Sequence, residues 1–168
     1  MSVDWIIYCV QFVLSLVVIS LRSRWFLFPK LDTLPRETAL IVVLGPQLFR
    51  HMGMFALSQA AYDSTIPLNW ASSIAIGDLL SHLSAVTAAI LLHRRAAFSI
   101  ASAWVATGVG LVCFVIPSVI LLQSPFPIHR LYAAWFLPAP FVPAVLMSHL
   151  CTFRYLRPRQ GQPIASTA

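Results

Sequence analysis

Five long apolar runs, separated by short polar segments, constrain the fold of this chain more than any other feature of its sequence. Each run is long enough to cross a hydrocarbon core of about 30 Å as an α-helix. The sequence therefore predicts an all-α integral membrane bundle of five transmembrane helices, over residues 5–21, 38–59, 70–92, 96–122 and 131–153. We expect residues 1–156 to form this transmembrane domain and residues 157–168 to form a disordered cytoplasmic tail.

The composition supports a membrane protein, since 59% of the residues are hydrophobic and 10% are charged. An average soluble domain carries about 25% charged residues. The formal net charge is +6, but the basic residues neither follow one helix face nor alternate with aromatic residues, as they do in surfaces that bind nucleic acid. We therefore predict the lipid bilayer as a partner and no nucleic acid.

The distribution of Lys and Arg predicts how the helices are oriented. Nine of the eleven basic residues lie in segments that share one side of the membrane: Arg22, Arg24, Lys30, Arg36, Arg94, Arg95, Arg154, Arg157 and Arg159. Because Lys and Arg concentrate in cytoplasmic segments, we expect the N-terminus outside and the C-terminus in the cytoplasm.

Two opposite charges lie within the predicted spans. Arg50 is nine residues below the outer end of the second span, and Asp78 is eight residues below the outer end of the third. A charge at the centre of a membrane helix costs about 2.5 to 3.5 kcal/mol, so each residue should find a partner inside the protein. Since the two lie at equal depth on neighbouring helices, we predict an ion pair between them.

Further polar residues share the faces of these two charges. On each helix they fall on one arc at about 100° per residue. The predicted network consists of Gln47, Arg50, His51, Asp78, Ser81 and His82, and Ser58 lies on the same arc as Arg50. We expect this network to bind a small polar or anionic molecule or to pass protons.

The two histidines of the network admit three roles. As neutral partners of the ion pair they are structural, and as proton acceptors they could relay protons. As axial ligands from two helices they could hold a b-type haem in an electron-transfer subunit. No metal site is predicted, since no third close ligand accompanies Asp78 and His82. The other histidines lie near span boundaries and are assigned no function: His93, His129 and His149.

Prolines interrupt two of the spans. Pro46, one turn before Arg50, removes a backbone hydrogen bond and either kinks the helix and opens a polar cavity or is tolerated locally. Three more prolines stand near the start of the last span: Pro138, Pro140 and Pro143. Because these three cannot all lie inside an unbroken helix, we expect a discontinuous segment that gates the outer side of the network.

The fourth span carries small residues at helical spacing, namely Ser102, Ala106, Gly110, Cys113 and Pro117. Such a face lets another helix approach closely, either within the chain or in a homo-oligomer or membrane partner. If a partner docks there and the polar network only fixes helix register, the chain is a non-catalytic accessory subunit of a membrane complex. We do not predict an enzyme, because the sequence contains no phosphate-binding glycine loop, nucleophile elbow or paired metal motif.

Three segments, "FRHMGMF", "GDLLSHLSA" and "FLPAPFVPAVLMSHL", resemble a family of small bacterial inner-membrane proteins of unknown function. The positions that carry the resemblance are Phe49, Arg50, His51, Gly53, Gly77, Asp78, Pro143 and His149. The resemblance implies a bacterial inner membrane and adds no activity or cofactor.

Overall fold

The computed structural model describes residues 3–123, 130 and 138–157, and within them every regular element is a helix. The elements are α1 Val3–Arg22, η1 Ser23–Leu27, α2 Phe28–Leu31, α3 Arg36–Leu48, η2 Arg50–Met54, α4 Phe55–Tyr62, α5 Leu68–His93, α6 Ser99–Gln123 and α7 Pro138–Leu156. The predicted all-α fold is confirmed for this part of the chain. The predicted tail lies outside it, apart from Arg157.

Within the described residues, three helical stretches are long and apolar enough to cross a membrane: Trp5–Leu31, Leu68–His93 and Ser99–Gln123. They correspond to the predicted first, third and fourth spans. The chain is therefore a helical protein with three candidate membrane-spanning helices, which indicates a membrane protein. The segment predicted as the second span is helical but is divided among three elements, whereas the described part of the fifth, from Pro138 onward, is one helix.

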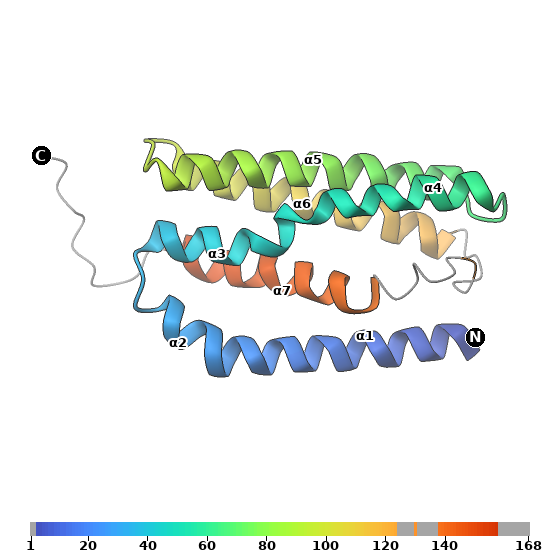
Figure 1. Cartoon of the computed structure of the whole chain (residues 1–168), viewed down its shortest axis with the longest axis horizontal. Coiled ribbons are helices and arrows are strands. Elements are labelled where there is room, and N and C mark those ends of the chain that lie inside the picture. The colour runs from blue at the N-terminus through green and yellow to red at the C-terminus, as the bar shows by residue number, and fades with distance from the viewer. Residues whose placement is uncertain (1–2, 124–129, 131–137, 158–168) are drawn as a thin grey trace, which may run out of the picture.

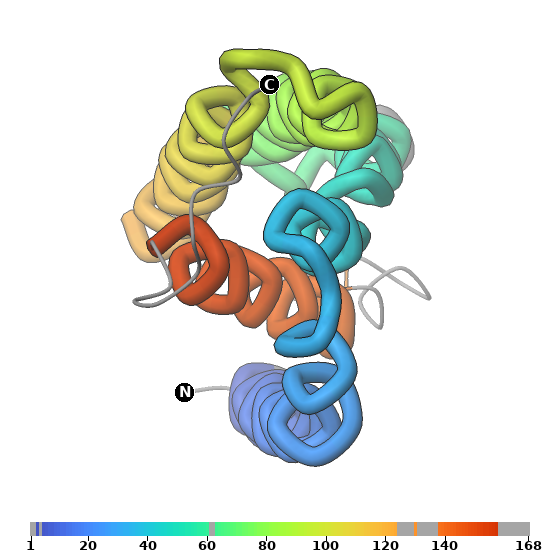
Figure 2. Tube along the Cα trace, turned by 90° about the vertical axis from the view of Figure 1, so that its left-hand side faces the viewer, coloured from blue at the N-terminus to red at the C-terminus, as the bar shows by residue number. Residues whose placement is uncertain are grey.

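The helices run roughly along one common axis (Figure 1). Seen along that axis, α5, α6, α7 and the segment from α3 to α4 surround the centre of the bundle, while α1 lies outside them against α7 (Figure 2). The outward faces of α1, α5 and α6 carry many exposed large apolar side chains. Polar side chains that are buried must therefore be satisfied inside the ring of helices.

The predicted second span is divided into α3, the 3₁₀ turn η2 and α4. Pro46 has no N–H and cannot bond to the carbonyl of Val42, which weakens the last turn of α3. Phe49 then leaves the helical conformation with φ −97° and ψ 3°, and its N–H donates to the Pro46 carbonyl at 3.3 Å. Figure 1 shows the result as a sideways step of the chain from α3, beside α7, to α4, beside α5.

All three prolines of the predicted last span lie within α7. Pro138 and Pro140 occupy the first turn, where backbone N–H groups have no acceptor within the helix, so they break no hydrogen bond. Pro143 removes one bond, to the carbonyl of Ala139. The expectation that the three cannot share one helix is therefore wrong. Residues 131–137, the beginning of that predicted span, lie outside the described residues.

The end of the bundle that carries most of the basic residues is joined by polar contacts between α7 and the segment from α2 to α3. Arg36 donates from Nε to the Tyr155 carbonyl at 2.9 Å and from Nη2 to the Leu156 carbonyl. These two carbonyl groups lie in the last turn of α7, where no N–H group of the helix is available to bond them. Arg36 supplies the missing donors and so caps the helix. Asp32 accepts from Arg154 Nη2 at 2.8 Å and from the Tyr155 hydroxyl at 2.9 Å.

The small-residue face of α6 is buried within the chain. Ala106, Gly110, Cys113 and Pro117 all lie in the interior, and α5 and α6 form the most extensive helix pair of the described residues. A Cβ added at Gly77 of α5 would lie 3.0 Å from the Cβ of Cys113. The close approach predicted for this face is thus made within the chain, by α5 at Cys113. A homo-oligomer or membrane partner stays a prediction, and its contact would have to use another face.

Candidate functional site

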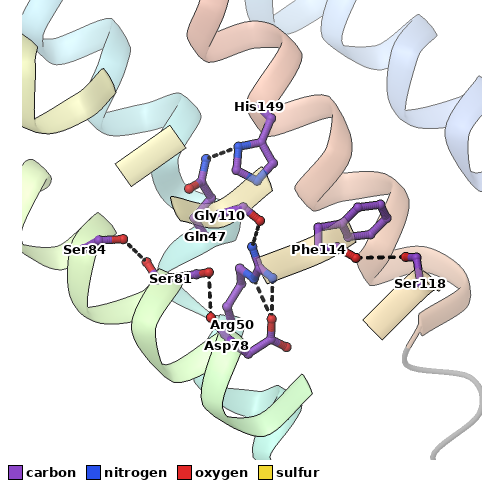
Figure 3. A network of polar contacts seen from close by, with 10 residues as sticks. Gln47, Arg50, Asp78, Ser81, Ser84, Gly110, Phe114, Ser118 and His149 are labelled. Carbon is purple, nitrogen blue, oxygen red and sulfur yellow. Dashed lines mark hydrogen bonds and ion pairs between the residues drawn. The ribbon is translucent and has the colours of Figure 1, made fainter. Parts of the chain in front are cut away.

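Arg50, the first residue of η2, joins three elements at the centre of the bundle: η2, α5 and α6. Its Nε donates to Asp78 Oδ1 at 2.7 Å, and Nη2 lies 2.5 Å from the same oxygen. Nη1 donates to the carbonyl oxygen of Gly110 in α6 at 2.8 Å. The residue is 3% exposed. The ion pair predicted between the second and third spans is therefore present, and Figure 3 shows the guanidinium between α5 and α6.

The position of the Asp78 carboxylate depends on Gly53, which has no side chain. Both contacts with Arg50 go to Oδ1, and Oδ2 lies against the backbone of Gly53 in η2. A Cβ added at Gly53 would collide with Oδ2, and the Asp78 side chain would have to move. Glycine at this position thus lets η2 lie directly on the carboxylate, which keeps Arg50 and its partner in register.

A second group of buried polar residues lies next to the guanidinium, between α3 and α7. Gln47 Nε2 donates to the Ser148 hydroxyl at 3.0 Å and lies 3.3 Å from His149 Nδ1. Gln47 and His149 are 0% and 1% exposed. Gln47 Oε1 and His149 Nε2 are buried without a hydrogen-bond partner among the described residues. Buried polar atoms of this kind mark a place where a further polar group is needed.

His149 packs against the same point of α6 as Arg50 does. A Cβ added at Gly110 would lie 2.5 Å from His149 Cε1 and 3.2 Å from Arg50 Nη1. Only a glycine leaves room for the imidazole and the guanidinium beside the carbonyl that Arg50 binds. Figure 3 shows His149 on the far side of Gly110 from Asp78, so the polar centre extends from α5 across α6 to α7.

Arg50 and Asp78 also form part of the wall of a cavity of about 340 Å³. The rest of the wall comes from α1, α5, α6 and α7 and is mainly apolar and aromatic. Its aromatic residues are Trp5, Tyr8, Phe12, Trp70, Phe114 and Phe141. The hydroxyl of Ser118, another lining residue, donates to the Phe114 carbonyl at 2.9 Å and is already bonded. The ion pair is thus the charged part of an otherwise apolar cavity.

The guanidinium has donor capacity left over. A guanidinium carries five N–H donors, and the contacts of Arg50 within the described residues use three of them, two toward Asp78 and one toward Gly110. The remaining N–H groups sit on the two terminal nitrogens of a residue that lines the cavity. A hydrogen-bond acceptor in the cavity can therefore bind Arg50 without disturbing its pairing with Asp78.

The other residues of the predicted network are arranged differently from the expectation. His51 is exposed and His82 is half-buried. The Nδ1 atom of His51 lies 3.2 Å from the Leu48 carbonyl oxygen, and the Nδ1 atom of His82 lies 2.7 Å from the same oxygen. That carbonyl lies at the broken end of α3, where no helical N–H follows to bond it. The expected inward position of His51 and Ser58 is wrong, since both are exposed. These residues do not share one helix face with Arg50, because the α-helix changes to a 3₁₀ turn after Phe49.

Two further expectations change with this arrangement. Ser81 is buried, but its hydroxyl donates to the Gly77 carbonyl of its own helix at 2.7 Å and not to the ion pair. The rings of His51 and His82 meet edge to face, with centroids 4.7 Å apart and planes at 68°. Two axial ligands must stand on opposite sides of a porphyrin and its iron. Rings in direct contact leave no room for that plane, so these residues do not fit a haem.

Four residues of the site are not recognised from the sequence as parts of it: Ser148, His149, Gly53 and Gly110. His149 was placed at a span boundary, yet α7 continues to Leu156 and buries His149 beside Arg50. A usable signal was present, because Ser148, His149 and Thr152 lie on one helical face with Val145. Gly110 and Gly53 contribute a carbonyl and an absent side chain, which no residue pattern reveals.

These features define a class: a helical membrane protein with a buried arginine–aspartate pair in the wall of an apolar cavity. The chain belongs to the family described as Domain of unknown function (DUF8737), whose model matches residues 7–157. The resemblance to a family without a known activity is thereby confirmed. Neither a curated protein nor a solved structure matches the chain.

Proposed function

We propose that the chain crosses the membrane five times, with the N-terminus outside and the C-terminus in the cytoplasm. Besides the three apolar helices, the segment from α3 to α4 and helix α7 run along the same axis (Figure 1). The segments that contain Arg22 to Arg36, Arg94 and Arg95, and Arg154 gather at one end of that axis. Lys and Arg mark the cytoplasmic side. A bacterial inner membrane stays a prediction, supported by the sequence resemblance.

Within this topology, we propose that the protein binds a small molecule from the bilayer that is mostly apolar and carries one polar acceptor group. The single observation that carries this proposal is the location of the Arg50–Asp78 pair in the wall of the aromatic cavity. Ligand sites in proteins are concave, mainly apolar and about 300 to 1,000 Å³ in volume, with a few polar groups that fix orientation. The cavity, at about 340 Å³, has these properties.

The charges at the site specify the acceptor. Arg50 and Asp78 together carry no net charge, so the site does not require an anion to neutralise it. The unused donors of Arg50 call for an oxygen acceptor, such as a carbonyl, a hydroxyl or a carboxylate. An uncharged or singly charged amphiphile satisfies this demand, whereas a highly charged solute would lose its hydration against the aromatic wall.

We place the access from the bilayer at α1, which lies outside the ring of the other helices. This helix supplies Trp5, Tyr8 and Phe12 to the cavity but packs chiefly against α7. The opposite wall belongs to α6, with which α1 shares no contact of comparable extent. A molecule dissolved in the lipid can therefore reach the cavity between these two helices without crossing water.

The test uses three photoreactive probes of equal chain length, a fatty acid, a fatty alcohol and an alkane, added to the protein in lipid nanodiscs. We expect the acid and the alcohol to label peptides of the cavity wall at least about tenfold more than the alkane, because a hydrogen bond to a charged group contributes about 1.5 to 3 kcal/mol. Val142→Trp fills the cavity and should abolish this labelling. Leu150→Trp, on the exposed face of the same helix, is the matched control. Equal labelling by all three probes, or by both variants, would contradict the proposal.

Proton passage is a second candidate, favoured by His149. Its buried Nε2 has no hydrogen-bond partner among the described residues and lies next to Gly110, which Arg50 binds. Histidine side chains are among the groups that form proton relays inside membrane proteins. If the protein conducts protons, liposomes that contain it should acidify under an imposed potential and His149→Gln should stop the flux. Acidification equal to that of empty liposomes would exclude this function and leave the ligand proposal intact.

A further inference from the structure

A second cavity, which forms a groove, lies at the end of α1, where α1 passes into η1 and α2. It measures about 420 Å³ and is lined by Ile19, Arg22, Ser23, Phe26, Leu27 and Lys30. None of these residues lines the cavity of Arg50 and Asp78. The groove is therefore a separate feature of the molecule, at the end of the candidate span Trp5–Leu31.

The lining residues combine two free cations with an apolar floor. Arg22 and Lys30 are both exposed, and the side chain of neither makes an ion pair or a hydrogen bond with another described residue. The apolar side chains in the lining are those of Ile19, Phe26 and Leu27. The nearest acidic residue along the chain, Asp32, is bound to Arg154 and Tyr155 of α7. The positive charge of the groove is thus not neutralised by that carboxylate.

The π-helical turn explains why the two cations share one groove. At about 100° per residue, two positions eight apart on an α-helix differ by about 80°. Residues Ser23–Leu27 form a π-helix, which winds by a smaller angle at each residue because its turn holds more residues. Five such residues remove most of the 80° difference. Arg22 and Lys30 are thereby brought to the same side of the chain, above the apolar floor.

The groove also lies at the depth along the membrane normal where a lipid head group is found. It lies where the apolar helix α1 ends, on the end of the bundle that carries most of the basic residues. The cytoplasmic leaflet contains anionic lipids, and basic side chains next to it attract them. A ligand here must offer a negative phosphate to two cations and an acyl chain to the apolar floor.

We propose that this groove binds one anionic phospholipid, with its phosphate between Arg22 and Lys30 and an acyl chain against Ile19, Phe26 and Leu27. This inference rests on the membrane orientation proposed above and is independent of the Arg50 site. Each cation near an anionic lipid contributes about a factor of five to affinity, so two of them give about a 25-fold preference over a zwitterionic lipid.

Native mass spectrometry of the full chain in mixed micelles measures this preference, with phosphatidylglycerol and phosphatidylcholine of identical chains as the two lipids. The double variant Arg22→Gln, Lys30→Gln should lose the preference. The control variant Arg94→Gln, Arg95→Gln removes the same charge from exposed positions at the same end of the bundle and should keep it. Thermal unfolding of both variants verifies that they are folded.

Two results would overturn the proposal. Equal loss of preference in both double variants would show that the net charge of this end attracts anionic lipid without a defined site. Displacement of the lipid by millimolar inorganic phosphate would show that the groove is a phosphate site in which the acyl chain plays no part. Persistence of the lipid in the presence of phosphate, together with loss only in the groove variant, is the expected outcome.

Discussion

Gly110→Ala is the smallest change that disturbs the polar centre without removing any of its charges. The added methyl would lie 2.5 Å from Cε1 and 3.0 Å from Nε2 of His149, and 3.2 Å from Nη1 of Arg50. The imidazole is 1% exposed and cannot move toward solvent. Either the ring or the guanidinium must therefore shift. The hydrogen bond from Arg50 to the Gly110 carbonyl is the contact that this shift would weaken most.

The magnitude follows from three contributions. Overpacking of a close-packed interior costs about 1 to 3 kcal/mol, and loss of a hydrogen bond to a charged group costs about 1.5 to 3 kcal/mol. Alanine gains up to about 1 kcal/mol over glycine in helix propensity. We therefore expect Gly110→Ala to lower the free energy of unfolding by about 2 to 5 kcal/mol.

Gly108→Ala is the matched control, because a Cβ at Gly108 meets nothing within 4 Å and the residue is exposed on the same helix. It should leave the stability unchanged or raise it by up to about 1 kcal/mol. Unfolding in mixed micelles by titration with sodium dodecyl sulfate, followed by circular dichroism, measures both variants. If the two alanines change the free energy of unfolding by the same amount, the close packing described around Gly110 is wrong.

Two further predictions concern contacts that hold the broken second span and the basic end of the bundle. His82→Ala removes the donor to the Leu48 carbonyl and should cost about 1 to 2 kcal/mol in the same assay, whereas His82→Asn, whose amide nitrogen can take the place of Nδ1, should restore most of the loss. Arg36→Gln removes the cap of α7 and should cost about 1 to 2 kcal/mol. Arg24→Gln, an exposed change at the same end, should cost less than about 0.5 kcal/mol, and a loss as large as that of Arg36→Gln would refute the capping role.

The pairing of Arg50 with Asp78 could be predicted because two lone charges in apolar runs have few ways to be satisfied. Their depths follow from counting residues inward from a shared loop, and that count tolerates an error of a turn in either helix. The helical character of the spans was equally accessible, since long apolar runs between basic segments favour helices in a bilayer. These inferences rest on composition and spacing, which the sequence contains directly.

The face of each polar residue was harder to predict. Pro46 signalled a disturbance, but whether the helix bends, breaks or continues depends on what packs around it. Because a 3₁₀ turn winds by about 120° per residue, the five residues of η2 rotate the helical arc. Arg50 therefore faces the interior while His51 and Ser58 face outward. His149 was missed for a related reason, since its depth was counted from a span that ends later than assumed.

A double-mutant cycle of Arg50→Gln and Asp78→Asn, measured as free energies of unfolding in mixed micelles, tests the central claim most directly. Asp78→Asn alone leaves a guanidinium buried without its partner and should cost about 3 to 5 kcal/mol. The double variant buries two neutral amides in their place and should be more stable than Asp78→Asn, with a coupling energy of at least about 2 kcal/mol. Losses that add to within about 0.5 kcal/mol would show that the two residues do not interact inside the bundle.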